Sequence, residues 1–136
     1  MSLPELTAQL IDFREQRNWA QFHSLRNLIV SLNLEAAELL ELTQWKSDAE
    51  VAALSASAAT REALRDECAD VLFYLLLIAE RAGIDLEEAA RAKLLKNAAR
   101  YPVETSYGSS RKYDQLPPDD GGDRPTSDFS EPRPRA

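Results

Sequence analysis

The feature that most constrains this chain is an apolar run with two carboxylates at its start. Residues 71–79 read VLFYLLLIA, and Glu67 and Asp70 come just before them. A helix that is apolar on nearly every side is normally buried, so the two acids must lie at or near the interior. Their spacing of three residues places them on one helix face, so both can point at the same object. Acids in that position need a cation.

A second acidic pair repeats this spacing earlier in the chain. Glu35 and Glu38 lie between Leu34 and Leu39 in an amphipathic helical pattern. Acids at this spacing more often form a solvated face. Here, however, an unpaired carboxylate beside an apolar run would be costly to desolvate. Two such pairs on two helices predict four carboxylates around one point in a helical bundle, where facing helices often build metal sites.

The ligand types indicate which metal and which substrate such a site would take. Oxygen-only ligation favours Mg²⁺, with Mn²⁺ as the alternative, over zinc, which favours His and Cys. A di-iron bundle needs Glu-x-x-His motifs, and the single histidine, His23, is not placed to supply one. Mg²⁺ commonly binds carboxylates together with substrate phosphates, which predicts a nucleoside phosphate substrate. The rings of Trp19, Trp45 and Tyr74 could stack on a nucleobase, although core packing is the ordinary role of such rings.

Composition limits the partners of the chain. At 136 residues we expect one folded domain, with a core that oligomerisation would help to complete. The net charge of -7 and the absence of a basic patch argue against a nucleic-acid or anionic membrane partner. The single cysteine, Cys68, fits a reducing compartment, and we expect it to be a small core residue. With no long apolar segment and no signal peptide pattern, the prediction is a soluble, cytoplasmic protein.

Helical periodicity and capping signals predict an all-α fold, since no stretch alternates as a strand does. Serines at likely caps and Gly83 at a helix end divide the chain into four main helices and a short one after Ser47. The long helices are expected at residues 4–18, 24–43, 60–82 and 85–99. The all-α domain is expected to span residues 1–106, followed by a mostly disordered tail at residues 107–136, which is rich in Pro, Gly, Asp, Ser and Arg.

Six motifs carry a family resemblance: Trp19-Ala20-Gln21-Phe22-His23, Glu35-x-x-Glu38, Gln44-Trp45-Lys46-Ser47, Glu67-x-x-Asp70-Val71-Leu72-x-Tyr74, Lys93-x-x-x-Asn97 and Arg100-Tyr101-Pro102-Val103. Together they resemble the dCTP pyrophosphatase branch of the MazG-like all-α nucleoside triphosphate pyrophosphohydrolases. The resemblance covers roughly residues 5–116.

The resemblance implies a four-helix MazG-like bundle completed by homo-oligomerisation, with a dimer of dimers as the expected assembly and pockets that involve more than one chain. It implies that four acids bind Mg²⁺: Glu35, Glu38, Glu67 and Asp70. It also implies a nucleotide pocket formed by Trp19, Ala20, Gln21, Phe22, His23, Trp45 and Tyr74. Lys93 and Asn97 are expected to reach the base or the phosphates, and Lys112 matches a family lysine that approaches the phosphates.

The expected reaction is Mg²⁺-dependent hydrolysis between the α and β phosphates of dCTP and modified dCTP, giving dCMP and pyrophosphate. Its expected role is sanitation of the nucleotide pool, with Glu38 as the acceptor of the water's proton. One departure concerns selectivity. Animal members have a histidine nine residues before the first pocket tryptophan, and this chain has Leu10 there, so the resemblance leaves the base preference open.

Three other functions remain open at the level of sequence. Two are enzymes: a broad-specificity house-cleaning pyrophosphatase for non-standard nucleotides, and an all-α dUTP hydrolase. The third is a non-catalytic helical interaction protein, in which the tryptophans anchor a partner and the acidic faces are only solvent-exposed surface. This last class predicts neither metal dependence nor nucleotide binding.

Overall fold

The computed structural model describes residues 1–118, and among these every regular element is helical. The all-α prediction is therefore confirmed. The chain divides into two compact units, Met1–Leu86 and a second unit that starts at Glu87. None of the helices in the described residues has the length and apolar character that a membrane span requires.

The first unit contains four α-helices and two short 3₁₀ turns. They are α1 (Leu3–Gln16), η1 (Ala20–Phe22), α2 (Leu25–Glu41), α3 (Asp48–Ala52), η2 (Ala53–Ser55) and α4 (Ala58–Ala82). The predicted helix centres are all present, and the predicted ends differ by two residues or fewer in α1, α2 and α4. The two predicted acidic pairs both lie within this unit, Glu35 and Glu38 on α2 and Glu67 and Asp70 on α4.

Side-chain caps set the starts of these helices. The hydroxyls of Ser2 and Ser47 accept N–H bonds from Glu5 and Glu50, whose carboxylates bond back to the serine N–H groups, which makes two capping boxes. Ser57 accepts the N–H of Thr60, so α4 begins at Ala58 and not at residue 60 as predicted. These local bonds explain why serine positions in the sequence locate the helix starts so closely.

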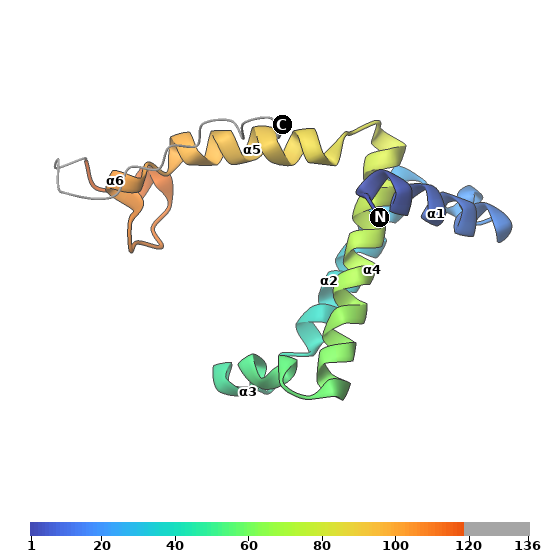
Figure 1. Cartoon of the computed structure of the whole chain (residues 1–136), viewed down its shortest axis with the longest axis horizontal. Helices are drawn as coiled ribbons and strands as arrows, with labels where there is room; N and C mark the ends of the chain where they lie inside the picture. The colour runs from blue at the N-terminus through green and yellow to red at the C-terminus, as the bar shows by residue number, and fades with distance from the viewer. Residues whose placement is uncertain (119–136) are drawn as a thin grey trace, which may run out of the picture. The chain divides into compact units, whose positions relative to one another are not determined.

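The long helices α2 and α4 run antiparallel and lie side by side, and α1 packs on α4 (Figure 1). Buried apolar side chains form a small core: Leu28, Leu54, Leu76, Leu77 and Ala79. Cys68, on α4, is exposed, so the prediction that it is a small core residue is wrong. The helix pair brings the two acidic motifs onto neighbouring helices.

Within the first unit, much of the apolar surface of α2 is exposed. Its exposed large side chains are Leu25, Ile29, Val30, Leu34 and Leu40, and Leu40 is 68% exposed. Single exposed apolar residues are ordinary on a protein surface, but several on one helix are typical of a surface that another chain covers. These α2 side chains are therefore candidates for the interface of the predicted oligomer.

The second unit contains α5 (Leu86–Arg100), α6 (Val103–Ser106) and a 3₁₀ turn, η3 (Tyr113–Gln115). Tyr101 and Tyr113 meet edge to face, with ring centroids 6.2 Å apart, and the Arg100 guanidinium lies 5.2 Å from the Tyr113 centroid. The predicted tail at residues 107–136 is described only as far as residue 118, and residues 119–136 lie outside the described residues. The boundary predicted after residue 106 stays a prediction.

Candidate active site

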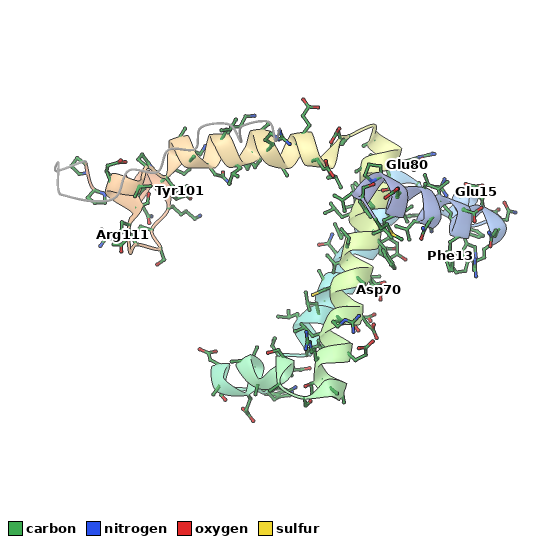
Figure 2. All side chains as sticks on the ribbon, viewed as in Figure 1. Phe13, Glu15, Asp70, Glu80, Tyr101 and Arg111 are labelled. Atoms are coloured by element: carbon green, nitrogen blue, oxygen red, sulfur yellow. The ribbon has the colours of Figure 1, made fainter. Side chains whose placement is uncertain are left out.

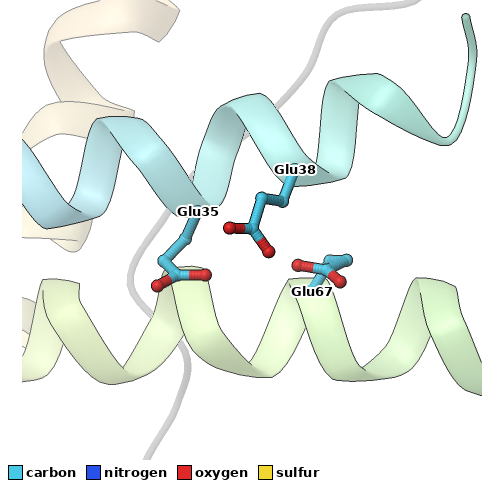
Figure 3. A group of neighbouring side chains, drawn as sticks. All are labelled: Glu35, Glu38 and Glu67. Carbon is cyan, nitrogen blue, oxygen red and sulfur yellow. The ribbon is translucent and has the colours of Figure 1, made fainter.

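Three glutamates converge between α2 and α4 (Figure 3). Glu35 and Glu38 come from α2, one helical turn apart, and Glu67 comes from α4. One carboxylate oxygen of each lies within 4.8 Å of the others. The antiparallel packing of α2 on α4 brings the motifs together, and the spacing of three residues turns Glu35 and Glu38 to the same side. Glu35 and Glu67 are half-buried, and Glu38 is exposed.

The cluster is electrostatically unfavourable without a counter-charge. Burial, followed by the negative charges of Glu38, Asp70 and Glu67, raises the pKa of Glu35 above its ordinary value. Burial also raises the pKa of Glu67, with Glu38 and Asp70 as the leading charged neighbours. In addition, Oε2 of Glu67 is buried and has no hydrogen-bond partner among residues 1–118. Mutual repulsion together with an unpartnered buried oxygen fits a site for a divalent cation.

Asp70 lies where this cluster meets a cavity. Its charge contributes to the raised pKa values of Glu35 and Glu67, so it is close to both. It also lines a cavity of about 440 Å³, a size usual for small-molecule sites. The sequence predicted four carboxylates around one point. The structure groups three of them closely, and Asp70 lines the cavity beside them.

The cavity is largely apolar and is lined by α1, by α4 and by the two residues that flank η1, Trp19 and His23. Leu6, Leu10 and Phe13 of α1 contribute to its wall, as do Phe73 and Leu77 of α4. Gln9, Arg14, Asp70 and His23 bring polar groups to the same space, and Trp19 and Tyr74 bring amphipathic rings. An apolar cavity with a few polar groups and aromatic rings suits a flat, partly polar ligand.

Trp19 is held at the cavity by aromatic and cationic contacts. Its ring meets Phe13 edge to face, with centroids 5.9 Å apart, and the Arg17 guanidinium lies 3.5 Å from the Phe13 centroid. The backbone reaches Trp19 through Asn18, which has a positive φ of 54°. Asparagine tolerates this left-handed conformation better than most residues, and the turn directs the chain from α1 toward the cavity.

The structure brings together only part of the predicted nucleotide pocket. Trp19, His23 and Tyr74 line the cavity. Ala20, Gln21 and Phe22 form η1 between the first two, outside the cavity lining, and the Gln21 amide donates to the Asn18 carbonyl at 2.9 Å. Lys93 and Asn97 lie exposed on α5 in the second unit.

Trp45 lies outside the cavity. Trp45 comes seven residues after Glu38, a spacing that would place both near one helical face if the helix continued. However, α2 ends at Glu41 and the chain turns, with a positive φ of 61° at Trp45 itself. Its ring is 94% exposed. The argument from helical spacing therefore fails for this residue, because the helix does not continue to it.

Comparison with known proteins bears directly on this arrangement. The sequence profile described as MazG-like family matches residues 30–116, which include both acidic motifs. The chain belongs to the MazG-like family. This confirms the family resemblance and the all-α fold class.

Named relatives of this MazG-like chain are pyrophosphatases. It is 46% identical over 106 residues to dCTP pyrophosphatase 1 of Rattus norvegicus and 44% identical over 106 residues to that of Homo sapiens. Each match covers 78% of this chain and 62% of the relative, so the chain spans less than two thirds of their length. The crystal structure of a pyrophosphatase from Archaeoglobus fulgidus is similar with a TM-score of 0.66 and 40% identity, over 73% of this chain and 91% of that one.

Sequence reasoning missed the contribution of α1 to the cavity of the MazG-like domain. Leu6, Leu10 and Phe13 recur at helical spacing, which indicates an apolar face but not whether it packs in a core or lines a space. Arg14 was missed as well, because its partner Glu80 lies 66 positions further along the chain. The one available signal was that three apolar residues of α1 precede Trp19 closely.

Proposed function

We propose that this protein hydrolyses dCTP and modified dCTP to dCMP and pyrophosphate. One observation carries the proposal: an acidic cluster suited to a metal and its phosphates adjoins, at Asp70, a cavity suited to a base. The names of the relatives, dCTP pyrophosphatase 1, support the same substrate. We further propose a role in nucleotide-pool sanitation in the cytoplasm, which the single cysteine and the acidic composition fit.

The cofactor we propose is Mg²⁺, with Mn²⁺ as the alternative. The residues fit such an ion, since all the candidate ligands are carboxylates and the buried Oε2 of Glu67 has no hydrogen-bond partner in the part of the chain that the structure describes. Glu35, Glu38 and Glu67 would hold it, with Asp70 as the fourth acid. When bound, the ion supplies positive charge to phosphate oxygens and lowers the pKa of a coordinated water.

The remaining roles belong to side chains of the chain itself. Glu38 is the exposed member of the cluster, and we propose that it accepts the proton of the attacking water. Trp19 and Tyr74 line the cavity with flat faces that can stack on the base, and His23 offers a ring nitrogen to a polar edge. Such a site acts mainly by positioning the phosphates and neutralising their charge.

Several proposed contacts rest on the family resemblance alone. These are Ala20, Gln21 and Phe22 of η1, Trp45 after α2, and Lys93 and Asn97 of α5. We keep them as substrate-binding proposals, and Lys112 as a proposed phosphate contact. A domain boundary after residue 106 remains part of the same proposal.

We also propose a homo-oligomer, assembled as a dimer of dimers. The exposed apolar side chains of α2 support it, because burying them against a second copy would remove a large apolar surface from water. The small core of the first unit supports it too, since a chain with few buried residues gains stability from an interface.

The test is pyrophosphate release from a panel of nucleotides: dCTP, 5-methyl-dCTP, dUTP, dTTP and dATP, each with Mg²⁺ and with EDTA. We expect metal-dependent turnover that is fastest with the two cytosine nucleotides. Preference for dUTP would identify an all-α dUTP hydrolase, and equal rates a broad-specificity house-cleaning enzyme. No turnover with any nucleotide would overturn the proposal and favour a non-catalytic interaction protein.

A further inference from the structure

Arg14 links α1 to α4, the two helices that line the cavity. It lies in the last turn of α1, lines the cavity, and its side chain is only 11% exposed. Its Nη1 lies 3.3 Å from Oε2 of Glu80 on α4, near the point where α1 meets α4 (Figure 2). Glu80 lies ten residues after Asp70 on the same helix. The pair therefore connects α1 directly to the helix that carries Glu67, Asp70 and Tyr74.

The same guanidinium also binds a neighbour on its own helix. Nε and Nη2 of Arg14 donate to Oε1 of Glu15 at 3.1 and 2.9 Å. A planar guanidinium with several fixed donors can hold two carboxylates at once, which an ammonium group does less well. Glu15 contacts the guanidinium from the same helix and is half-exposed, whereas Glu80 joins Arg14 to α4.

The backbone of Arg14 holds the segment that follows α1. Its carbonyl oxygen accepts the N–H of Arg17 at 3.2 Å and the N–H of Trp19 at 3.1 Å. The position of Trp19 at the cavity is thus tied to Arg14 by a direct hydrogen bond. A displacement of Arg14 would move Trp19 with it.

Arg14 also acts on the environment of His23. The His23 side chain lines the cavity, and its Nδ1 is buried without a hydrogen-bond partner in the described residues. Burial, and secondly the positive charge of Arg14, lower the pKa of His23. A neutral imidazole has one donor and one acceptor nitrogen and can bond a polar edge of a nucleobase.

We propose that Arg14 is a positioning residue for base recognition, which acts by clamping α1 to α4 through Glu80. The clamp holds Trp19 and His23 at the cavity wall across from Tyr74. This inference rests on the proposed function, since it takes the cavity to be the place where the base binds. It assigns no chemical step to Arg14 itself.

The test compares Michaelis constants for dCTP among matched variants. Glu80→Gln weakens the link between the helices, and Glu15→Gln is the control, because Glu15 bonds the same guanidinium without joining α1 to α4. We expect Glu80→Gln and Arg14→Met to raise KM about tenfold. We expect kcat to stay within about twofold, because the clamp affects ground-state and transition-state binding alike. Glu15→Gln should leave KM near that of the wild type.

A charge exchange separates positioning from mere loss of stability. The double variant Arg14→Glu/Glu80→Arg should recover much of the lost affinity for dCTP, while either single exchange should not. Thermal melts of each variant identify a temperature at which all are folded for the kinetic assays. A KM unchanged in both Arg14→Met and Glu80→Gln, or a fall in kcat alone, would overturn the clamp. Wild-type protein that turns over no nucleotide would instead overturn the proposed function together with it.

Discussion

Asp70 adjoins both halves of the proposed site. It lines the cavity and raises the pKa values of Glu35 and Glu67, so its carboxylate is close to both the cavity and the acidic cluster. We predict that Asp70→Asn lowers kcat at least about a hundredfold and leaves the fold intact, because the change keeps the shape but removes one charge. Glu62→Gln, an exposed site earlier on α4, is the control. Near wild-type turnover in Asp70→Asn would contradict the metal assignment.

The raised pKa values of Glu35 and Glu67 predict how stability depends on pH. Between the glutamate pKa of the unfolded chain, about 4.3, and the raised pKa of the folded protein, the folded protein binds more protons than the unfolded chain. The contribution of these two glutamates to the free energy of unfolding therefore decreases as the pH rises through this range. In metal-free buffer, Glu67→Gln should therefore melt at a higher temperature than the wild type at neutral pH. The gain should disappear once the pH is low enough to protonate Glu67 in both states.

Glu50 provides a control of opposite sign for this experiment. Its hydrogen bonds to the N–H and hydroxyl of Ser47 lower its pKa, so it contributes stability that is lost as pH falls. Glu50→Gln should accordingly melt at a lower temperature than the wild type at neutral pH. Added Mg²⁺ should raise the melting temperature of the wild type but not of Glu67→Gln. If both variants shifted in the same direction, the electrostatic account of the cluster would be wrong.

At the scale of the element, Gly83 is the C-cap of α4, the helix that lines one side of the cavity. It has a φ of 65°, and a Cβ built there would meet no atom within 4 Å, so only the backbone conformation opposes a side chain. We predict that Gly83→Ala lowers the free energy of unfolding by about 1 kcal/mol. Gly83→Asn should cost less, because asparagine tolerates the left-handed region. Urea unfolding measures both, and equal stability of all three proteins would contradict the prediction.

The sequence predicted elements whose determinants are local. Capping serines and Gly83 locate helix ends because each acts through a bond or a conformation within a few residues. The acidic cluster was predicted because carboxylates beside apolar runs are costly to desolvate unless a cation neutralises them, and two such pairs occur on two helices. Helical spacing could not locate the Trp45 side chain, because α2 ends at Glu41 and the chain turns before it reaches Trp45.

Features that depend on distant partners could not be predicted in this way. The Arg14–Glu80 pair joins residues 66 positions apart, and nothing in either local sequence indicates the other. The exposure of Cys68 likewise depends on which face of α4 is covered by α2 and α1. An apolar residue pattern shows that a face avoids water, but the tertiary packing decides whether it meets a core, a cavity or a second chain.

At the scale of the whole molecule, the exposed face of α2 predicts association. Wild-type protein should behave in light scattering as a multiple of the 15.2 kDa chain, because Val30 and Leu40 would otherwise remain in water. Val30→Asp should shift the mass toward that of one chain, since a charge at an apolar interface is costly. Gln16→Glu, which adds a negative charge at an exposed polar position on α1, is the control. A wild-type mass of one chain at micromolar concentration would contradict the proposed assembly.

The most direct test of the account is a crystal structure with Mn²⁺ and a non-hydrolysable dCTP analogue whose α and β phosphates are joined by an imido group. We predict an anomalous Mn²⁺ signal among Glu35, Glu38 and Glu67, with Asp70 beside it. We predict the cytosine ring in the cavity next to Trp19 and Tyr74. A metal bound elsewhere, or a base outside this cavity, would contradict the claim that the cluster and the cavity are one active site.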